Sequence, residues 1–162
     1  MNIRPATPED VPAVLPMVSK IAEFHEQLDA AKYAVRGDPA KAYHRWMIAR
    51  ASDPRSVFLV ADAAAAGETA KLVAFLVAGV QEEIPIYQIV EHGFIYDLWV
   101  EPEYRNEGIA RQMVTLAVEQ FRQIGVKQVR LDTAFTNEPA QGLFKSCGFR
   151  PSTTEMLLEL RD

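Results

Sequence analysis

The sequence contains a single cysteine and no long hydrophobic run. Cys147 is the only thiol among 162 residues, so the chain cannot form an internal disulfide. No apolar stretch approaches the roughly 20 residues that a membrane-spanning helix needs. Residues 1–4 lead into strand-like sequence instead of a cationic leader followed by an apolar segment. These absences predict a cytoplasmic protein that does not act at a membrane.

Ligand spacing for a metal is also missing. The three histidines are scattered, and none has a cysteine or a second histidine at the spacing typical of zinc sites. They are His25, His44 and His92. We therefore expect no metal, and of the three we consider only His92, which precedes the last long strand, a candidate for mutation.

Positive charge is nowhere concentrated. Residues 1–80 hold nine Lys or Arg and nine Asp or Glu, whereas residues 81–162 hold eight and thirteen, so the whole net charge of -5 lies in the second half. A basic stripe that follows a phosphate backbone is absent, which argues against nucleic acid as a partner. The acidic residues around positions 82–107 favour a cationic partner such as an amine. The alternative interpretation is that these residues only form a solvated surface.

The length and composition suit one compact domain over residues 1–162. Hydrophobic residues make up 49% of the chain and charged residues 24%, as in ordinary globular proteins. No internal repeat or low-complexity linker marks a boundary.

Hydrophobic spacing and capping residues predict an α+β chain. Strands are expected at Asn2–Arg4, Val57–Ala61, Leu72–Val80, Phe94–Val100, Val126–Leu131 and Met156–Leu160. Helices are expected from the Thr7 cap to Leu28, after Asp38-Pro39, from about Glu107 to Ile124, and from Asn137 to Cys147. Residues 62–69 and 81–93 are expected to be loops, and the second of them to shape a substrate pocket.

A tight glycine-containing loop lies between the strand that ends at Val100 and the helix that follows. It reads Arg105-Asn-Glu-Gly108-Ile-Ala110. A strand, a short loop and a helix N-terminus present unpaired backbone N–H groups at the positive end of a helix dipole, which suits a pyrophosphate. Gly108 permits close backbone approach, and Arg105 and Arg111 add charge. An ordinary turn is the alternative.

A second motif follows some thirty residues later. It reads Asn137-Glu-Pro-Ala140-Gln-Gly-Leu-Phe144-Lys-Ser-Cys-Gly148-Phe149. In this order the two segments resemble the GNAT superfamily of N-acetyltransferases, whose loop has the form Arg/Gln-x-x-Gly-x-Gly/Ala and whose later helix has the form Asn-x-x-Ala-x-x-x-Tyr. The resemblance covers the element order from Asn2 to Leu160. It implies a mixed, mostly antiparallel central sheet, helices on both faces, and a splayed, β-bulged strand at the cofactor site.

The same resemblance implies acetyl-CoA as co-substrate and direct transfer of acetyl to an amine within a ternary complex. Backbone groups of Leu98, Trp99 and Val100 are implied to contact the acetyl carbonyl and the pantetheine arm. The loop implied to hold the pyrophosphate consists of Arg105, Asn106, Glu107, Gly108, Ile109, Ala110 and Arg111. Asn137 is implied to contact the cofactor, and Ala140 and Phe144 to line the pantetheine channel.

Acetyl transfer to an amine needs a proton acceptor, because an alkyl amine with a pKa of about 10.4 is mostly protonated at neutral pH. Asp97 is the first candidate, with Glu101 and Glu103 as alternatives. Polyamine acetyltransferases, which the opening Ile3-Arg-Pro-Ala-Thr7 resembles, carry an acid pair where this chain has Tyr96 and Asp97. The alternative for Asp97 is a structural carboxylate that accepts hydrogen bonds from backbone amides. The alternative for Glu101 and Glu103 is that both are solvated turn residues. The Val100 N–H is implied to be the oxyanion donor.

Phe144 stands where many relatives carry a tyrosine proposed to protonate the leaving thiolate. Tyr96, Tyr104, Cys147 or a water remain alternative donors. We predict an N-acetyltransferase that acts on a primary amine of a small molecule or peptide, with a homodimer as the candidate assembly. The alternatives are a catalytically silent acetyl-CoA sensor or partner-binding module, and an NAD-binding enzyme on a Rossmann-like sheet.

Overall fold

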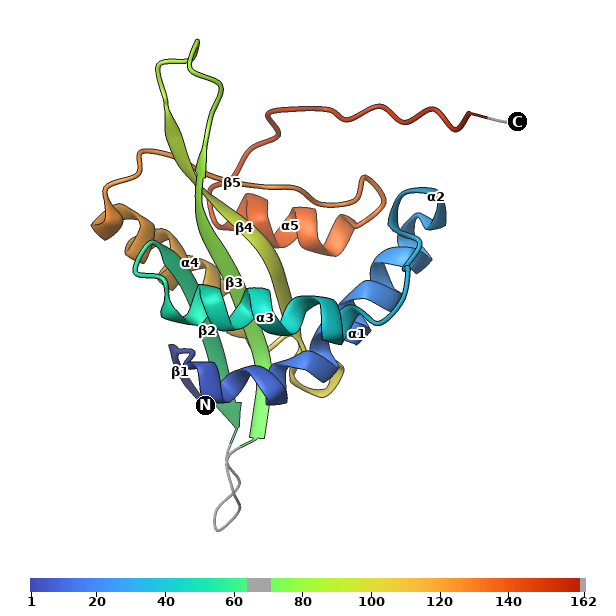
Figure 1. Cartoon of the computed structure of the whole chain (residues 1–162), viewed down its shortest axis with the longest axis vertical. Helices are drawn as coiled ribbons and strands as arrows, with labels where there is room; N and C mark the ends of the chain where they lie inside the picture. Colours follow the sequence, from blue (N-terminus) through green and yellow to red (C-terminus); the bar gives the residue numbers. More distant parts are fainter. Residues whose placement is uncertain (64–70, 161–162) are drawn as a thin grey trace.

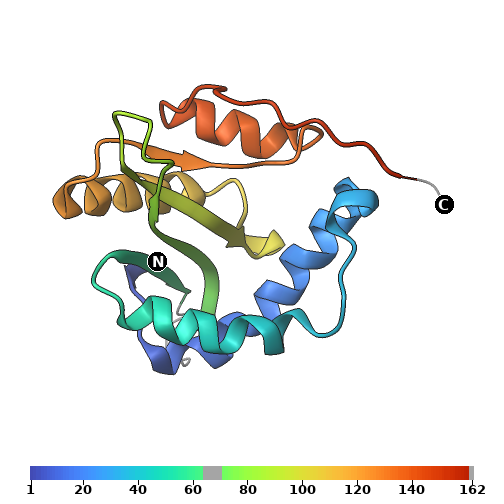
Figure 2. The same cartoon turned by 45° about the horizontal axis from the view of Figure 1, so that its top comes forward.

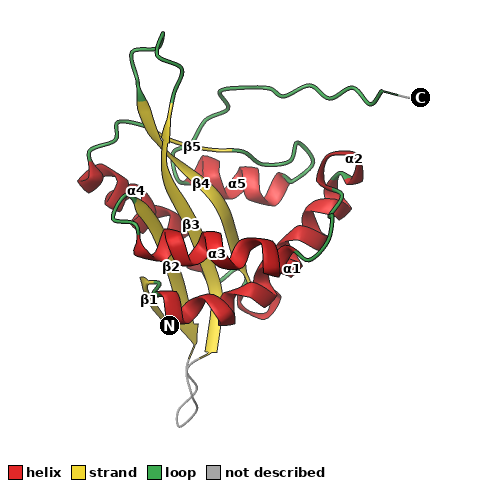
Figure 3. Cartoon of the chain, viewed as in Figure 1, coloured by secondary structure: helices red, strands yellow, loops and turns green. Residues whose placement is uncertain are grey.

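The computed structural model describes residues 1–63 and 71–160, which form five strands packed between helices (Figures 1 and 3). The strands are Asn2–Pro5 (β1), Ser56–Ala63 (β2), Lys71–Glu82 (β3), Glu91–Val100 (β4) and Val129–Leu131 (β5). The α-helices are Val11–Leu28 (α1), Ala30–Tyr33 (α2), Pro39–Ser52 (α3), Ile109–Ile124 (α4) and Glu138–Ser146 (α5). Two 3-10 turns, Pro8–Asp10 (η1) and Pro102–Tyr104 (η2), precede α1 and α4.

The sheet has the order β1-β2-β3-β4-β5, in which only β4 and β5 are parallel. Helices α1 and α3 cover one face, and α4 and α5 lie on the other (Figure 2). The predicted α+β class, with a mixed and mostly antiparallel sheet and helices on both faces, is confirmed.

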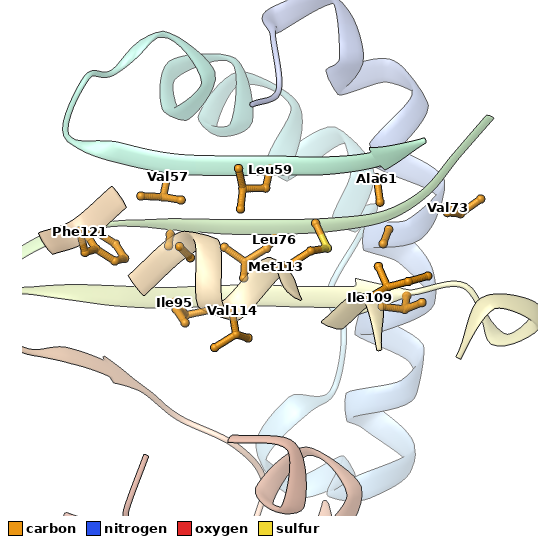
Figure 4. Packing of buried hydrophobic residues seen from close by; sticks show 14 residues of the cluster. Val57, Leu59, Ala61, Val73, Leu76, Ile95, Ile109, Met113, Val114 and Phe121 are labelled. Atoms are coloured by element: carbon orange, nitrogen blue, oxygen red, sulfur yellow. The ribbon is translucent and has the colours of Figure 1, made fainter. Parts of the chain in front are cut away.

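Each face of the sheet has its own hydrophobic core, because side chains of successive strand residues point to opposite faces. The core under α4 joins Met113, Val114 and Phe121 to strand residues (Figure 4). The strand residues labelled in the figure are Val57, Leu59, Ala61, Val73, Leu76 and Ile95. The core under α1 and α3 contains Val14, Met17 and Met47 together with Phe75 and Trp99. The central strands are therefore buried on both sides.

Caps at the helix starts follow the sequence prediction. Thr7 and Asp10 form a reciprocal capping box, with Pro8 at the first position of the turn. The Asp38 carboxylate accepts a hydrogen bond from the Lys41 N–H at the start of α3. Gly125 ends α4 with φ at 97°, a left-handed conformation that glycine adopts without strain.

The loops and the C-terminal segment differ from expectation. β3 extends to Glu82 and β4 begins at Glu91, so the predicted loop 81–93 shortens at both ends to residues 83–90, which connect the hairpin. The predicted strand Met156–Leu160 is wrong: residues 151–160 are exposed and without regular structure, because no neighbouring strand satisfies their backbone (Figure 1). Most of the predicted loop 62–69 lies outside the described residues.

Within the part of the chain that the structure describes, no helix is both long enough and apolar enough to cross a bilayer.

Candidate active site

A β-bulge in β4 sets the direction of the side chains at the candidate site. Asp97 pairs with Val77, but the next pair along the ladder joins Ala78 to Ile95, so Tyr96 is the extra residue. Ile95 belongs to the core under α4, whereas Tyr96 packs against the core under α1 and α3. The bulge therefore places Tyr96 and Asp97 together on the α1 and α3 face.

β4 and β5 separate beyond the bulge. β5 pairs with β4 only from Gly93 to Ile95, so the rest of that edge has no strand beside it (Figure 2). The Glu101 N–H donates to the Val73 carbonyl in β3 at 2.8 Å. Because hydrogen-bonding direction alternates along a strand, the N–H groups of Leu98 and Val100 face the open edge. The expected splayed and bulged strand is present.

The loop after β4 presents backbone amides without partners in the helix. Asn106 and Gly108 both have positive φ, at 66° and 81°. The Gln112 N–H donates to the Gly108 carbonyl, and this is the first helical bond of α4. The preceding amides, those of Ile109, Ala110 and Arg111, therefore lie at the positive end of the helix dipole.

Nothing on the helix itself competes with an anion at this end. Gly108 provides no side-chain cap, and the first turn of α4 contains no acidic residue. Glu107 is exposed at the rim of the loop. This arrangement fits the phosphate groups of a nucleotide-bearing substrate.

The two arginines of the motif have local partners. Arg105 donates from Nε to the Val100 carbonyl at 3.0 Å, and its guanidinium lies 4.7 Å from the centre of the Trp99 ring. Arg111 donates to the Ser146 carbonyl at 3.5 Å, which links α4 to the end of α5. Both side chains thus hold the loop and the helices in place.

The second motif forms the start of α5. Asn137 is buried, and its side-chain oxygen accepts a hydrogen bond from the Ala140 N–H at 3.3 Å. Phe144 packs edge-on against Phe149, with the ring centres 5.7 Å apart. Leu98, Ala110 and Phe144 all contact the core under α4. The structure therefore brings the strand, the loop and the later helix to one side of the sheet.

Asp97 lies on the opposite face, at the wall of a cavity of about 160 Å³. Its side chain is buried, and Oδ2 has no hydrogen-bond partner among the described residues. Burial raises the pKa of Asp97 to about 6, and the nearby Tyr43 hydroxyl partly opposes this rise. A carboxylate with this pKa is ionised at neutral pH and can accept a proton.

The cavity is lined by residues from α1, α2, α3 and β4. We call it the Asp97 cavity, and its walls are Val18, Ile21, Ala22, His25, Tyr33, Val35, Pro39, Tyr43 and Asp97. Burial lowers the pKa of His25. Burial, followed by the Asp97 charge, raises the pKa of Tyr43, so its phenol stays neutral.

Aromatic rings extend from this cavity along the sheet. Tyr96 meets Trp46 edge-on at 5.2 Å between ring centres, and Trp46 meets Tyr43 at 5.3 Å. On the other side, Phe24 lies 6.2 Å from Trp99. Tyr96 is thus packed between aromatic side chains beside the candidate base.

Glu101 is not a solvated turn residue. It is buried, and its two oxygens accept from Lys20 Nζ at 2.7 Å and from the Trp99 indole N–H at 3.2 Å. Although burial opposes the change, these partners hold the pKa of Glu101 below its ordinary value. An ionised carboxylate with both oxygens occupied is a poor proton acceptor, and Glu103 is exposed as expected.

We expect Glu101→Ala to lower the free energy of unfolding by about 1–3 kcal/mol, because the buried Trp99 N–H loses its acceptor. Glu103→Ala is the matched control, and we expect a change within about 0.5 kcal/mol because that side chain is exposed. Urea denaturation of both variants measures the difference. Equal effects of the two substitutions would contradict the assignment of Glu101 as a structural anchor.

Two other candidates lie away from the open edge. Cys147 lines a separate hollow of about 250 Å³ with Val118 and Arg122 of α4. These helix residues follow Ile109 by nine and thirteen positions, which places them about 14–20 Å along the helix axis from the loop. His92 is buried near the other end of β4, opposite Gln81.

The acidic residues near the hairpin do not form a pocket for a cationic ligand, because arginines of this chain already pair with them. Glu83 pairs with Arg130, and Glu91 pairs with Arg55. No residue of the predicted loop 81–93 lines the hollow that contains Asp97, and its role in a substrate pocket stays a prediction. Sequence reasoning missed the other polar walls of that hollow, Tyr33 and Tyr43, because four separate segments contribute them.

In residues 1–63 and 71–160, no three His, Cys, Asp or Glu side chains are grouped so that they could hold a metal ion.

Comparison with known proteins gives a consistent match. A sequence profile described as the acetyltransferase (GNAT) family matches residues 21–149. The chain is 26% identical over 156 residues to YhfO, an uncharacterized N-acetyltransferase of Bacillus subtilis, and the match covers 94% of this chain and 92% of that protein.

Solved structures share the fold. A mutant BH1408 protein from Bacillus halodurans superposes with a TM-score of 0.84 at 24% identity, covering 99% of this chain and 100% of the other. The aminoglycoside N-acetyltransferase AAC(6')-Iy, solved in complex with CoA, gives a TM-score of 0.69 at 16% identity and covers 99% of this chain and 95% of the other.

Proposed function

Because the chain belongs to the acetyltransferase (GNAT) family, we propose that it transfers an acetyl group from acetyl-CoA to a primary amine of a small molecule or peptide. The observation that carries this proposal is the open edge of β4. At one end this edge leads into a loop with free backbone amides, and the same strand carries a buried carboxylate with an unpartnered oxygen.

Acetyl-CoA fits the groups on the α4 side of the sheet. The amides of Ile109, Ala110 and Arg111 suit its pyrophosphate, and the apolar surface of Leu98, Ala110 and Phe144 suits its pantetheine arm. The loop residues Arg105, Asn106, Glu107 and Gly108, together with Asn137 and Ala140, complete the proposed site. The CoA complex of AAC(6')-Iy supports CoA as the carrier. When bound, acetyl-CoA supplies the thioester that is attacked and the thiol that leaves.

Asp97 is the proposed proton acceptor. An ammonium group near its carboxylate must lose a proton before the nitrogen can attack, and a base whose pKa lies near neutrality serves this step. Tyr96 borders the same face and shapes the approach. Removal of the proton by Asp97 leaves a neutral amine beside the open edge of β4.

The Val100 N–H is the proposed donor to the carbonyl oxygen as negative charge develops on it. It faces the open edge, and a fixed backbone donor needs no reorganisation. Tyr104 shares the α4-side core with Phe144, so it or a water supplies the proton to the thiolate. A thiol with a pKa of about 8.5 is in any case a fair leaving group at neutral pH.

Release of free CoA thiol across a panel of amines tests the function. We expect turnover well above the rate without protein for at least one amine, and mass spectrometry should detect the acetylated product. Binding of acetyl-CoA without turnover of any amine would instead favour the silent sensor that Phe144 suggests. Tight binding of NAD in place of acetyl-CoA would overturn both readings.

We expect Cys147→Ala to keep turnover within about twofold of the unmodified protein, because Cys147 lines a hollow with Val118 and Arg122 of α4 to which β4 contributes no residue. The variant also removes the protein's own thiol from the assay. A loss of turnover of a hundredfold or more would restore Cys147 as a proton donor.

We also propose that residues 1–162 act as one domain in the cytoplasm, and that the chain forms a homodimer. Light scattering coupled to size exclusion measures the assembly directly.

A further inference from the structure

The charges on the walls of the Asp97 cavity indicate which kind of ligand it can bind. Among the described residues that line it, Asp97 is the only one ionised at neutral pH, because burial lowers the pKa of His25 and raises that of Tyr43. Asp97 is nine-tenths buried, and its Oδ2 has no hydrogen-bond partner among the described residues. An isolated buried carboxylate is stabilised by a cation, so a single positive charge is the missing partner.

The remaining walls carry no further charge. Val18, Ile21, Ala22, Val35 and Pro39 are apolar, His25, Tyr33 and Tyr43 offer only neutral hydrogen-bonding groups, and no lysine or arginine among the described residues lines the cavity. A carboxylate or phosphate on the ligand would therefore lie unpaired near Asp97. A ligand with many hydroxyls would lose more hydrogen bonds to water than His25, Tyr33 and Tyr43 can replace.

Three aromatic rings line the cavity among the described residues. His25 and Tyr33 lie 5.2 Å apart between ring centres, and Tyr43 lines the cavity beside Asp97. Ring faces attract ammonium groups, and they also pack well against flat apolar stems.

The volume limits the size of the ligand. The cavity holds about 160 Å³, and a protein cavity of about 150 Å³ is enough for one benzene molecule. One ring or a short alkyl chain fills it, and an oligosaccharide does not.

We propose that the Asp97 cavity binds a small primary amine with one positive charge on an uncharged apolar stem, and that it excludes amino acids and polyhydroxylated amino sugars. That this amine is the acetyl acceptor rests on the proposed function. The inference separates this chain from the fold neighbour named as an aminoglycoside N-acetyltransferase.

NMR titration of the purified protein tests the inference without any need for turnover. The ligands are 2-phenylethylamine, phenylalanine, 2-phenylethanol and kanamycin. Phenylalanine adds a carboxylate to the same ring and chain, and 2-phenylethanol removes the charge. We expect 2-phenylethylamine to bind at least tenfold more tightly than each of the other three.

Two variants assign the effect to the cavity. We expect Asp97→Asn to weaken 2-phenylethylamine binding at least tenfold and to leave 2-phenylethanol binding unchanged. Asp132→Asn, which removes the same charge at an exposed position, should change neither. Unchanged binding of 2-phenylethylamine to Asp97→Asn would overturn the inference, as would kanamycin or phenylalanine binding as tightly as the amine.

The thiol-release assay separates the two proposals. Binding of 2-phenylethylamine without acetylation of it or of any other amine in the panel would overturn the proposed function and keep the cavity assignment. Acetylation of kanamycin without binding of 2-phenylethylamine would support the proposed acetyltransferase function and overturn the ligand class proposed for the Asp97 cavity.

Discussion

Asp97→Asn is expected to lower the turnover of a good amine substrate by about 10²- to 10⁴-fold. The substitution keeps the shape of the side chain but removes the proton acceptor. Because the pKa of Asp97 is raised to about 6, the wild-type kcat/KM should rise with pH through that value, and the variant should lack this step. Rate measurements from pH 5 to 8 with one amine check both points.

The same substitution is expected to stabilise the fold at pH 8. Burial disfavours the charged carboxylate in the folded state and raises its pKa from 3.8 to about 6. The folded protein therefore binds the proton more tightly than the unfolded chain, and stability falls as pH rises between these two values. Above pH 6 the folded state carries the full free-energy cost of burying the charged carboxylate, about 2–3 kcal/mol at 1.36 kcal/mol per pKa unit. Removing the charge should recover most of it.

Thermal unfolding at two pH values measures this gain. For a chain of this size, we expect a melting temperature about 5–10 °C higher for Asp97→Asn than for the wild type at pH 8. Below pH 4 the difference should shrink towards zero, since both states of the wild type then carry a protonated carboxyl. Asp132→Asn controls for a general effect of net charge. A variant less stable than the wild type at pH 8 would show that Asp97 has a stabilising partner.

Gly108→Trp is expected to reduce the affinity for acetyl-CoA at least a hundredfold, about 2.7 kcal/mol. A side chain at this position points into open space, since an added Cβ would meet only the tip of Gln112 at 3.8 Å. The free protein can therefore fold with the larger residue, which then occupies the space in front of the amides of α4. Calorimetric titration with acetyl-CoA measures the loss.

Gly125→Trp is the matched control. Gly125 also has positive φ, and an added Cβ there would meet nothing within 4 Å. Both substitutions carry the same backbone strain, roughly 1–2 kcal/mol, but Gly125 lies at the opposite end of α4. If both variants fold and bind acetyl-CoA equally well, the loop does not hold the pyrophosphate.

The loop from Arg105 to Arg111 was predictable because its signals are contiguous. A strand, a glycine and a helix start follow one another along the chain, and local backbone geometry alone makes the free amides. The fold class followed from similar local patterns, since period-two and helical spacings each span only a few residues. The strand predicted at Met156–Leu160 failed because a strand also needs a neighbour, and local spacing carries no information about one.

The side-chain environment of the candidate base depended on contacts between distant segments. Sequence reasoning gave Asp97 as the first candidate base and Glu101 as an alternative base or a solvated turn residue. Only the hydrogen bonds of Glu101 with Lys20 and Trp99 in the folded chain distinguish it from Asp97. The bulge at Tyr96 changes which face each side chain occupies, because one extra residue shifts the two-residue period.

The sequence by itself determined most of the strand and helix segments and the glycine-containing loop with free amides at the start of α4, because each depends on neighbouring residues. Tertiary structure alone decided that one carboxylate is buried without a partner in an aromatic hollow, since α1, α2, α3 and β4 meet only in the folded chain. Burial is a property of the assembled core, and it sets the pKa of Asp97.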